Sequence, residues 1–367
     1  MSAARPLPGG ARPDLSVLRE DLQSIQPYVV PAPHTGIKLD AMENPFALPA
    51  ELQDTLAQRL ARVALNRYPP ANPQAFKARL AAAMGVPDTA ALMLGNGSDE
   101  LIHLVIQACA KPGATVLSPW PSFAMYELSA RFDGCRFAPV PLQPDFRLDT
   151  PALLAAIADH RPAVVFLSYP NNPTGNLFAR DDVAAVLRAA PGLVVIDEAY
   201  LPFAQDTWMP QIADWPNLLV LRTLSKLGLA GIRLGYMAGA PEWIREIDKL
   251  RPPYNVNVLT LACADFLLDH LPVLNAQATE LRSERGRLSA ALAAQRGVTA
   301  FESAANFLLF RVAQPDAVFA GLKERGILIK NVSKMHLLTG CLRVTVGTPA
   351  ENDAFLQALK AALDESR

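Results

Sequence analysis

The 367-residue sequence has little of what several classes of protein need. Its four cysteines, Cys109, Cys135, Cys263 and Cys341, are scattered and form no Cys-x-x-Cys pair. That spacing fits neither a disulfide framework nor a zinc site. Charged residues make up 19% of the chain with a formal net charge of −1, so the basic stripe of a nucleic-acid-binding protein is missing. We therefore expect no bound metal and no nucleic-acid partner.

Long apolar runs are also missing. Residues 1–19 are rich in Pro, Gly and Arg and lack the apolar core of a signal peptide. The run Leu101–Ala110 is too short to span a bilayer. We expect a soluble, cytoplasmic protein with no membrane partner.

The chain does have enough apolar residues, 51% of the total, for two folded domains. Pro27, Pro31 and Pro33 would stop any helix near the N-terminus, and Arg251-Pro252-Pro253 marks a second break. The predicted parts are an extended arm over residues 1–38, a large domain over 39–255 and a small domain over 256–367.

The large domain alternates short apolar runs with amphipathic helical segments. Runs that are apolar throughout are typical of strands buried on both faces, so the alternation predicts an α/β layer with a mostly parallel sheet. The expected strands are Leu92–Leu94, Thr115–Leu117, Ala163–Leu167, Leu193–Ile196, Leu218–Leu221 and Leu234–Ala238. The expected helices include Ala50–Val63, Pro73–Met84, Asp99–Ala110 and Asp181–Ala190.

The C-terminal part lacks the strand–helix alternation of the large domain. One long helical stretch, Val258–Gln295, is followed by strands near Asn306–Arg311 and Cys341–Val346. Helices are expected near Asp316–Arg325 and Glu351–Asp364. This pattern predicts a smaller α+β domain.

Polar clusters follow four of the apolar strands. They are Gly95–Glu100, Ser168–Gly175, Asp197–Tyr200 and Thr223–Lys226. Ligand groups collect at the carboxyl ends of strands in open α/β sheets, so the four clusters together predict one binding site.

Two of these clusters carry a charge where burial is costly. Asp197 ends the run Leu-Val-Val-Ile and needs a partner; a pyridinium N–H would serve, although a helix cap or a salt bridge is the ordinary alternative. Lys226 closes an apolar strand just before the glycine-rich segment Gly228–Gly235. Burial lowers the pKa of a lysine and so supplies a neutral amine that attacks an aldehyde.

Two further features suit a phosphate. Ser98 or Asp99 is the expected N-cap of the helix after the first strand, and free N–H groups there favour an anion, although an ordinary capped loop would look the same. Arg233 lies among small and apolar residues in Gly231–Gly235, and its guanidinium fork matches a phosphate.

In their order and spacing, four motifs resemble those of the fold-type I pyridoxal-phosphate (PLP) enzymes, and the aminotransferase class I/II group is nearest. They are Asn171–Gly175, Asp197–Tyr200, Thr223–Lys226 and Gly231–Gly235. The likeness covers nearly the whole chain from about Ile25. It implies PLP as cofactor and a central, mostly parallel seven-stranded sheet between helices, with a smaller α+β C-terminal domain.

The resemblance also implies roles at the cofactor ring. Lys226 would bond to the cofactor and move the proton between the substrate α-carbon and C4′. Asp197 would pair with the pyridine nitrogen, and Tyr200 and Asn172 would hydrogen-bond the ring 3′-oxygen. Phe123 would stack on the ring, unless it is plain core packing.

Tyr68, in Asn66-Arg-Tyr-Pro69, matches a tyrosine that reaches the partner subunit's cofactor phosphate. That match implies a homodimer with sites at the interface, although a half-buried aromatic in a turn is the ordinary alternative. The residues implied to hold the phosphate within one subunit are Ser98, Asp99, Glu100, Thr223, Ser225 and Arg233.

Within the superfamily the chain resembles most the histidinol-phosphate aminotransferases, through Lys38–Pro45, Gln26-Pro-Tyr28, Asn66–Pro69 and Cys341–Gly347. The resemblance implies transamination of L-histidinol phosphate with 2-oxoglutarate to imidazole acetol phosphate and L-glutamate. Arg343 would bind the acidic end of the small-molecule substrate, and Tyr28 would help to close the site.

Four positions depart from that family pattern. Met42 replaces an asparagine, and Trp120 and Ser122 differ from the commoner Pro-Thr-Phe/Tyr sequence. Lys330 stands where an arginine is commoner; its ammonium would bind a phosphate as a point charge, or it is a solvated loop residue.

Other activities keep the same cofactor residues. An aromatic aminotransferase of the same clade differs only around Tyr28, Arg343 and Lys330. A threonine-phosphate decarboxylase would release carbon dioxide and need no 2-oxoglutarate. A PLP-binding transcription regulator would need a DNA-binding domain, for which the first 40 residues are too short and too rich in proline. The joint presence of Lys226, Asp197 and Tyr200 argues against a catalytically dead homologue.

Overall fold

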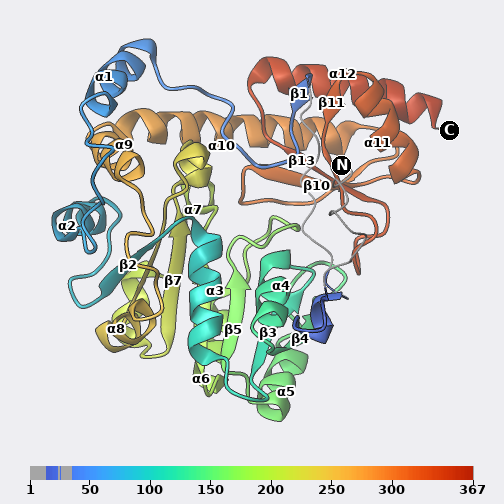
Figure 1. The fold of residues 1–367 in the computed structure, drawn as a ribbon. Helices are drawn as coiled ribbons and strands as arrows, with labels where there is room; N and C mark the ends of the chain where they lie inside the picture. The colour runs from blue at the N-terminus through green and yellow to red at the C-terminus, as the bar shows by residue number, and fades with distance from the viewer. Residues whose placement is uncertain (1–13, 24, 26–34, 367) are drawn as a thin grey trace. The chain divides into compact units, whose positions relative to one another are not determined.

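The computed structural model describes residues 14–23, 25 and 35–366. Contacts divide the chain into two units, Met1–Thr35 and Gly36–Arg367. In the described part of the first unit, η1 (Glu20–Gln23) forms a short 3-10 helix, and Arg19 pairs with Asp21 at 2.6 Å. All other elements belong to the second unit (Figure 1). The predicted domain boundaries at residues 38 and 255 stay predictions.

A seven-stranded sheet forms the centre of the second unit, and the predicted fold class is confirmed. β8 is antiparallel to β2 and β7, whereas every other neighbouring pair is parallel. In spatial order the strands are β2 (Ala91–Gly95), β8 (Gly235–Gly239), β7 (Leu218–Thr223), β6 (Leu193–Asp197), β5 (Val164–Ser168), β3 (Thr115–Trp120) and β4 (Arg136–Pro141).

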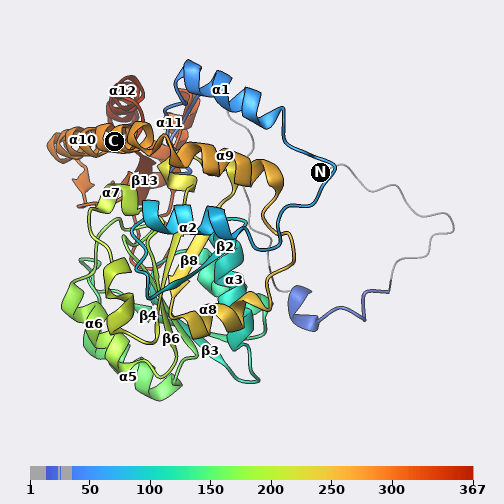
Figure 2. The same ribbon diagram turned by 90° about the vertical axis from the view of Figure 1, so that its left-hand side faces the viewer.

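Each central strand is buried on both faces. In β6, Leu193 and Val195 pack into one hydrophobic cluster, and Val194 and Ile196 pack into the other. Side chains alternate along a strand, so an all-apolar run places a core on each side of the sheet. Figure 2 shows α3 and α8 on one side and α5 and α6 on the other. The edge strand β4 is largely exposed and contains two prolines, Pro139 and Pro141. Because it has no continuous apolar run, the sequence did not predict this strand.

The four helices predicted in this part, which correspond to α1, α2, α3 and α6, lie within a few residues of their predicted ranges. The helix after β2 corrects one prediction: its N-cap is Gly97, with φ of 85°, in place of Ser98 or Asp99. The helices are α1 (Ala50–Leu60), α2 (Gln74–Ala83), α3 (Ser98–Cys109), α4 (Ala124–Phe132), α5 (Thr150–His160), α6 (Arg180–Ala189), α7 (Leu201–Ala204) and α8 (Pro241–Asp248). Short 3-10 turns are η2 (Met209–Asp214), η3 (Ser225–Leu227) and η4 (Ala230–Ile232).

The expected single helix over residues 258–295 is wrong. The structure has α9 (Val258–Leu268) and α10 (Leu271–Ala294), which are bent by 80° at the break. Pro272 lies in the first turn of α10. It has no N–H to donate to the carbonyl four residues earlier, that of Leu268, and its ring clashes with that carbonyl, so α9 ends at Leu268. No single helix among the described residues is long and apolar enough to cross a membrane. The bent pair α9–α10 reaches the required length and apolar composition only when its two helices are taken together.

A second, antiparallel sheet follows in the order β12 (Lys330–Asn331), β13 (Cys341–Thr345), β10 (Phe307–Arg311) and β9 (Thr299–Ala300). It is covered by α11 (Pro315–Glu324) and α12 (Pro349–Glu365). Near the N-terminal end of this unit, β1 (Ile37–Lys38) pairs in parallel with β11 (Ile327–Leu328).

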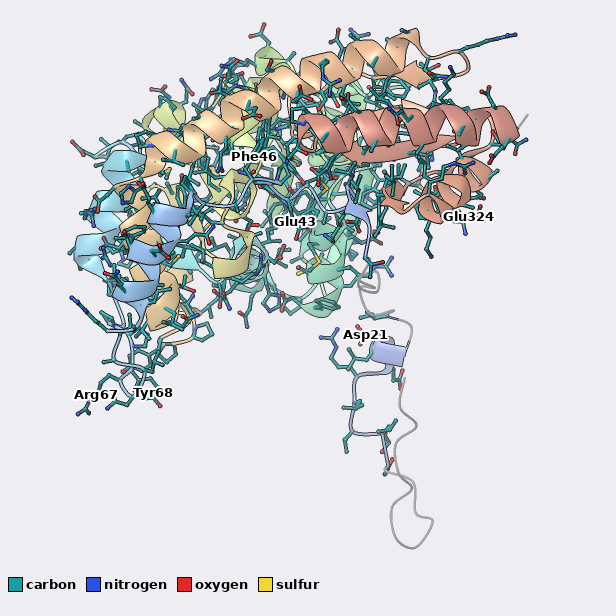
Figure 3. All side chains as sticks on the ribbon, turned by 90° about the horizontal axis from the view of Figure 1, so that it is seen from above. Asp21, Glu43, Phe46, Arg67, Tyr68 and Glu324 are labelled. Carbon is teal, nitrogen blue, oxygen red and sulfur yellow. The ribbon has the colours of Figure 1, made fainter. Side chains whose placement is uncertain are left out.

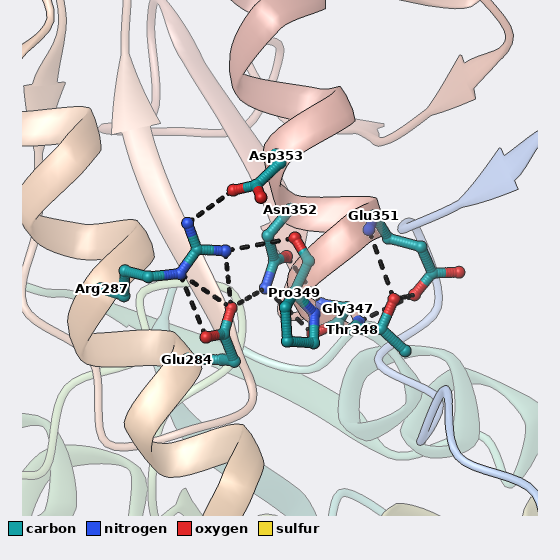
Figure 4. Close-up of polar contacts among 8 residues, drawn as sticks. All are labelled: Glu284, Arg287, Gly347, Thr348, Pro349, Glu351, Asn352 and Asp353. Atoms are coloured by element: carbon teal, nitrogen blue, oxygen red, sulfur yellow. Dashed lines mark hydrogen bonds and ion pairs between the residues drawn. The ribbon is translucent and has the colours of Figure 1, made fainter.

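Polar contacts fix the start of α12 against α10 (Figure 4). Arg287 bonds Glu284 at 2.8 Å and Asp353 at 2.6 Å. Asn352 donates to Glu284 and to the Gly347 carbonyl, at 2.9 Å each. These bonds hold the loop that directly follows β13, the strand that carries Arg343.

Candidate active site

A cavity of about 110 Å³ lies at the carboxyl ends of β5, β6 and β7. It brings together most of the residues predicted from the strand-end clusters. Its lining is Met42, Ser98, Asp99, Phe123, Ser168, Asn172, Asp197, Ala199, Tyr200, Thr223, Ser225, Lys226 and Arg233.

The Lys226 amine reaches this cavity from η3, immediately after β7. Its Nζ donates to the Ala41 carbonyl at 3.1 Å and lies 5.9 Å from the centre of the Tyr200 ring. Burial, and then the charge of Arg343, lowers the pKa of Lys226 to about 8. An amine with this pKa is partly neutral near pH 7 and can act as nucleophile or base.

Asp197 ends β6 and is only 3% exposed. Its Oδ2 accepts a hydrogen bond from the Tyr126 hydroxyl at 2.8 Å, and its Oδ1 accepts one from the Ala199 N–H at 3.1 Å. Burial raises the pKa of Asp197 to about 6, and the two hydrogen bonds oppose that rise. A cationic N–H in the cavity would favour its ionised form further.

A chain of hydrogen bonds joins the two sheets at the cavity. The Arg343 guanidinium donates to Asn172 Oδ1 at 2.5 Å and to the Asp40 carbonyl at 2.9 Å. Asn172 Nδ2 in turn contacts the Tyr200 hydroxyl at 3.0 Å. The predicted substrate arginine and the two predicted ring-oxygen partners are therefore connected, and the Asn172–Pro173 bond is cis.

Close backbone approach shapes the end of the cavity at α3. A Cβ on Gly97 would lie 2.6 Å from an Arg233 guanidinium nitrogen, and a Cβ on Gly235 would lie 2.7 Å from the Ser98 nitrogen. Thr223 and Ser225 add hydroxyls 2.9 Å apart. Arg233 contacts Asp99 at 3.3 Å. Hydroxyls, a helix N-terminus and a guanidinium form a donor set suited to a phosphate.

Several predicted residues lie outside the cavity lining. Glu100 turns away, because its carboxylate accepts from the Asn96 N–H at 2.5 Å and from Asn255 at 2.7 Å. Lys330 is half-buried in β12, directly opposite Arg343 on β13. Tyr28 lies outside the described residues.

Tyr68 is also remote from the cavity lining of its own chain. It is 81% exposed and stacks on Tyr254 with ring centres 4.7 Å apart. Figure 3 shows Arg67 and Tyr68 at the outer tip of a loop, pointing away from the sheet. The half-buried setting considered as its alternative is therefore wrong.

The residues present fit the predicted cofactor. The cavity offers one buried amine after β7, one buried carboxylate at the end of the neighbouring strand β6 and a phosphate-type donor set between α3 and β8. Within the described part of the chain, Asp99 and Asp197 are the acidic side chains that line it. Arg233 would face the dianionic phosphate of the cofactor, and Asp197 would face its protonated ring nitrogen.

Comparison with known proteins decides the family. The model of aminotransferase class I and II matches residues 34–359. The chain belongs to this family. It is 58% identical over 356 residues to histidinol-phosphate aminotransferase 1 of Ralstonia nicotianae, covering 95% of each chain. It is 57% identical over 345 residues to histidinol-phosphate aminotransferase of Chromobacterium violaceum, covering 94% of this chain and 97% of that one.

Solved structures agree with the family assignment. Histidinol-phosphate aminotransferase from Sinorhizobium meliloti, in complex with pyridoxal-5′-phosphate, superposes with a TM-score of 0.85 and 26% identity, covering 96% of this chain and 99% of that one. A putative aminotransferase from Burkholderia pseudomallei superposes with a TM-score of 0.78 and 29% identity, covering 91% and 100%. The family resemblance drawn from the motifs is confirmed.

Sequence reasoning gave no contact or lining role to three residues of this aminotransferase site, although it noted Met42 and the cluster that begins at Ser168. Tyr126 contacts Asp197, and Met42 and Ser168 line the cavity. A buried tyrosine hydroxyl needs a partner, and Tyr126 lies within a Phe123–Tyr126 aromatic pair visible in the sequence. The sequence therefore suggests that the Tyr126 hydroxyl has a hydrogen-bond partner, but it does not identify Asp197, which is 71 residues further along the chain.

Proposed function

We propose that this aminotransferase transfers the amino group of L-histidinol phosphate to 2-oxoglutarate, with PLP as its cofactor. The products are imidazole acetol phosphate and L-glutamate. The observation that carries the substrate is the 58% identity, over 95% of both chains, to a protein named histidinol-phosphate aminotransferase. The cofactor rests on the cavity described above and on the PLP complex of the Sinorhizobium meliloti enzyme.

Five residues act at the cofactor ring in this proposal. Bound PLP supplies an electron-withdrawing ring that stabilises negative charge at the substrate α-carbon. Lys226, with its pKa lowered to about 8, removes the α-proton and delivers it to C4′. Asp197 holds the proton on the ring nitrogen, and Asn172 and Tyr200 bind the ring oxygen. Phe123 covers the ring face.

The phosphate of the cofactor binds at the glycine-lined end of the cavity. Thr223 and Ser225 offer hydroxyls, Arg233 offers its guanidinium, and the backbone at Ser98–Asp99 offers free N–H groups at the start of α3. Gly97 and Gly235 let the backbone come this close, since a side chain at either position would meet Arg233 or α3.

The acidic end of the substrate binds Arg343. A guanidinium fork matches both a phosphate and a carboxylate, so one arginine serves histidinol phosphate and glutamate in turn. Lys330 lies opposite Arg343 in the register of β12 and β13 and adds a second positive charge for the phosphate. Tyr28 closes the site from the N-terminal arm.

The enzyme works as a homodimer in which Tyr68 reaches the phosphate of the partner subunit's cofactor. Its 81% exposure and outward direction support this role (Figure 3). A largely apolar hollow of about 480 Å³ between α2 and α9, with Phe76, Val258 and Leu261 in its lining, adds a surface for the second copy. We place the enzyme in the cytoplasm, with small molecules as its only other partners.

A half-reaction titration tests the substrate. The visible absorbance of the PLP-loaded enzyme is recorded while histidinol phosphate, tyrosine or threonine phosphate is added in separate cuvettes. We expect histidinol phosphate to remove the band and 2-oxoglutarate to restore it. A stronger response to tyrosine would point to an aromatic aminotransferase, and carbon dioxide release from threonine phosphate to a decarboxylase. Lys226→Ala is the control that should show no response.

A further inference from the structure

Tyr126 lies on α4 with its hydroxyl behind the cavity. It is fully buried, and the hydroxyl donates to Asp197 Oδ2 at 2.8 Å. Its ring stacks on Phe166 of β5 with centres 4.6 Å apart and planes 13° apart. The packing fixes the ring, so the hydroxyl is aimed at Asp197 alone among the carboxylates of the cavity.

The direction of this hydrogen bond is defined by chemistry. Burial, followed by the charge of Asp197, raises the pKa of Tyr126, so the phenol keeps its proton. An ionised carboxylate can only accept. Tyr126 is therefore the donor, and a donor to a carboxylate favours its charged form.

Asp197 has few other means of staying ionised. It is buried, and it also accepts a hydrogen bond from the Ala199 N–H at 3.1 Å. The carboxylates of Asp99 and Glu198 both disfavour its negative charge. Arg222 is paired with Glu198 at 2.9 Å, so its guanidinium is engaged by that carboxylate.

We propose that Tyr126 is a positioning residue that holds Asp197 ionised and oriented toward the ring nitrogen of the cofactor. This inference rests on the proposed contact between Asp197 and that nitrogen. Tyr126 also touches Phe123 edge-on, with ring centres 5.6 Å apart. One buried side chain thus supports both the residue at the ring nitrogen and the residue on the ring face.

A pair of ligands separates this role from simple packing. The affinity of the apoprotein is measured for PLP and for its 1-deaza analogue, in which a C–H replaces the ring nitrogen. Only PLP can use the Asp197 contact. We expect the wild type to prefer PLP, and Tyr126→Phe to reduce that preference by about tenfold to a hundredfold while leaving the affinity for the analogue nearly unchanged.

Tyr169→Phe is the matched control. Tyr169 is also buried and also donates to a carboxylate, that of Asp206 at 2.5 Å, but it does not line the cavity. It should keep the full preference for PLP. Asp197→Asn should reduce the preference at least as much as Tyr126→Phe does.

Each outcome decides between the alternatives. If Tyr126→Phe weakens both ligands equally, Tyr126 serves packing and the inference is wrong. If the wild type binds both ligands equally, the proposed Asp197 contact is wrong and the inference falls with it. A second readout uses the folded apoprotein without ligand: infrared titration of Asp197 should give a higher pKa in Tyr126→Phe than in the wild type, and an unchanged pKa would overturn the proposal.

Discussion

Burial moves two side chains of the cavity toward their neutral forms. It lowers the pKa of Lys226 to about 8 and raises the pKa of Asp197 to about 6. The two shifts serve different ends. A lysine with a lowered pKa supplies a neutral amine, whereas a cation beside an aspartate with a raised pKa would favour its ionised form further. A protonated ring nitrogen would provide that cation.

The shifted lysine predicts how cofactor attachment depends on pH. Only the neutral amine attacks an aldehyde, and with a pKa of about 8 its neutral fraction rises about tenfold between pH 7 and pH 9. The rate at which PLP bonds to the apoprotein should rise by the same factor and then level off. Stopped-flow absorbance measures this rate, and Lys226→Ala is the blank. A rate that climbs steadily to pH 10.5 would show that Lys226 keeps an ordinary pKa.

At the scale of elements, a buried ion pair ties the strand ends behind the site. Arg222 of β7 contacts Glu198, the residue after β6, at 2.9 Å, and both side chains are almost fully buried. Arg222 also donates to the Met84 carbonyl at the end of α2, at 2.8 Å, and Glu198 accepts from the Trp208 N–H at 2.5 Å. The pair therefore fixes the segments that carry Asp197 and Thr223.

Breaking this pair should destabilise the fold more than replacing it. Arg222→Met leaves Glu198 buried without its partner charge, at a cost of about 3 to 5 kcal/mol in free energy of unfolding. The double variant Arg222→Met/Glu198→Leu should be more stable than Arg222→Met alone. Urea unfolding of the apoproteins, with the exposed Arg245→Met as control, measures the difference. Simple additivity of the two single changes would contradict the coupling.

At the scale of the whole molecule, the proposed shared site predicts subunit complementation. Tyr68 is remote from its own cavity, and Lys226 lies inside it. A dimer of one Tyr68→Ala chain and one Lys226→Ala chain would hold one intact site and one doubly defective site.

Refolding the two variants together should therefore restore activity to about a quarter of that of the wild type, because half of the randomly formed dimers are mixed and each has one intact site. Each variant refolded alone gives the baseline. Activity no higher than the mean of the two baselines would mean that Tyr68 does not act across the interface. Sedimentation of the unmodified enzyme checks independently that the dimer exists.

The fold class, the family and the strand-end clusters could be predicted from the amino-acid sequence alone. Apolar runs such as Leu193–Ile196 have to be buried on both faces, and this requirement places the polar residues that follow them at one edge of the sheet. Asp197 and Lys226 could be predicted because a charge directly after such a run is costly to bury and needs a partner. These inferences depend only on local pattern and on the geometry of parallel strands.

Which side chains contact one another depends on the tertiary packing of the elements. The bond from Tyr126 to Asp197 depends on how α4 packs on the sheet, and the place of Lys330 beside Arg343 depends on the register of β12 and β13. Glu100 belongs to the predicted turn, yet Asn255 from a distant segment draws it away from the cavity. Residues far apart in the chain meet through packing, which minimises buried unpaired charge and empty space over the whole fold, and no local stretch of sequence encodes that balance.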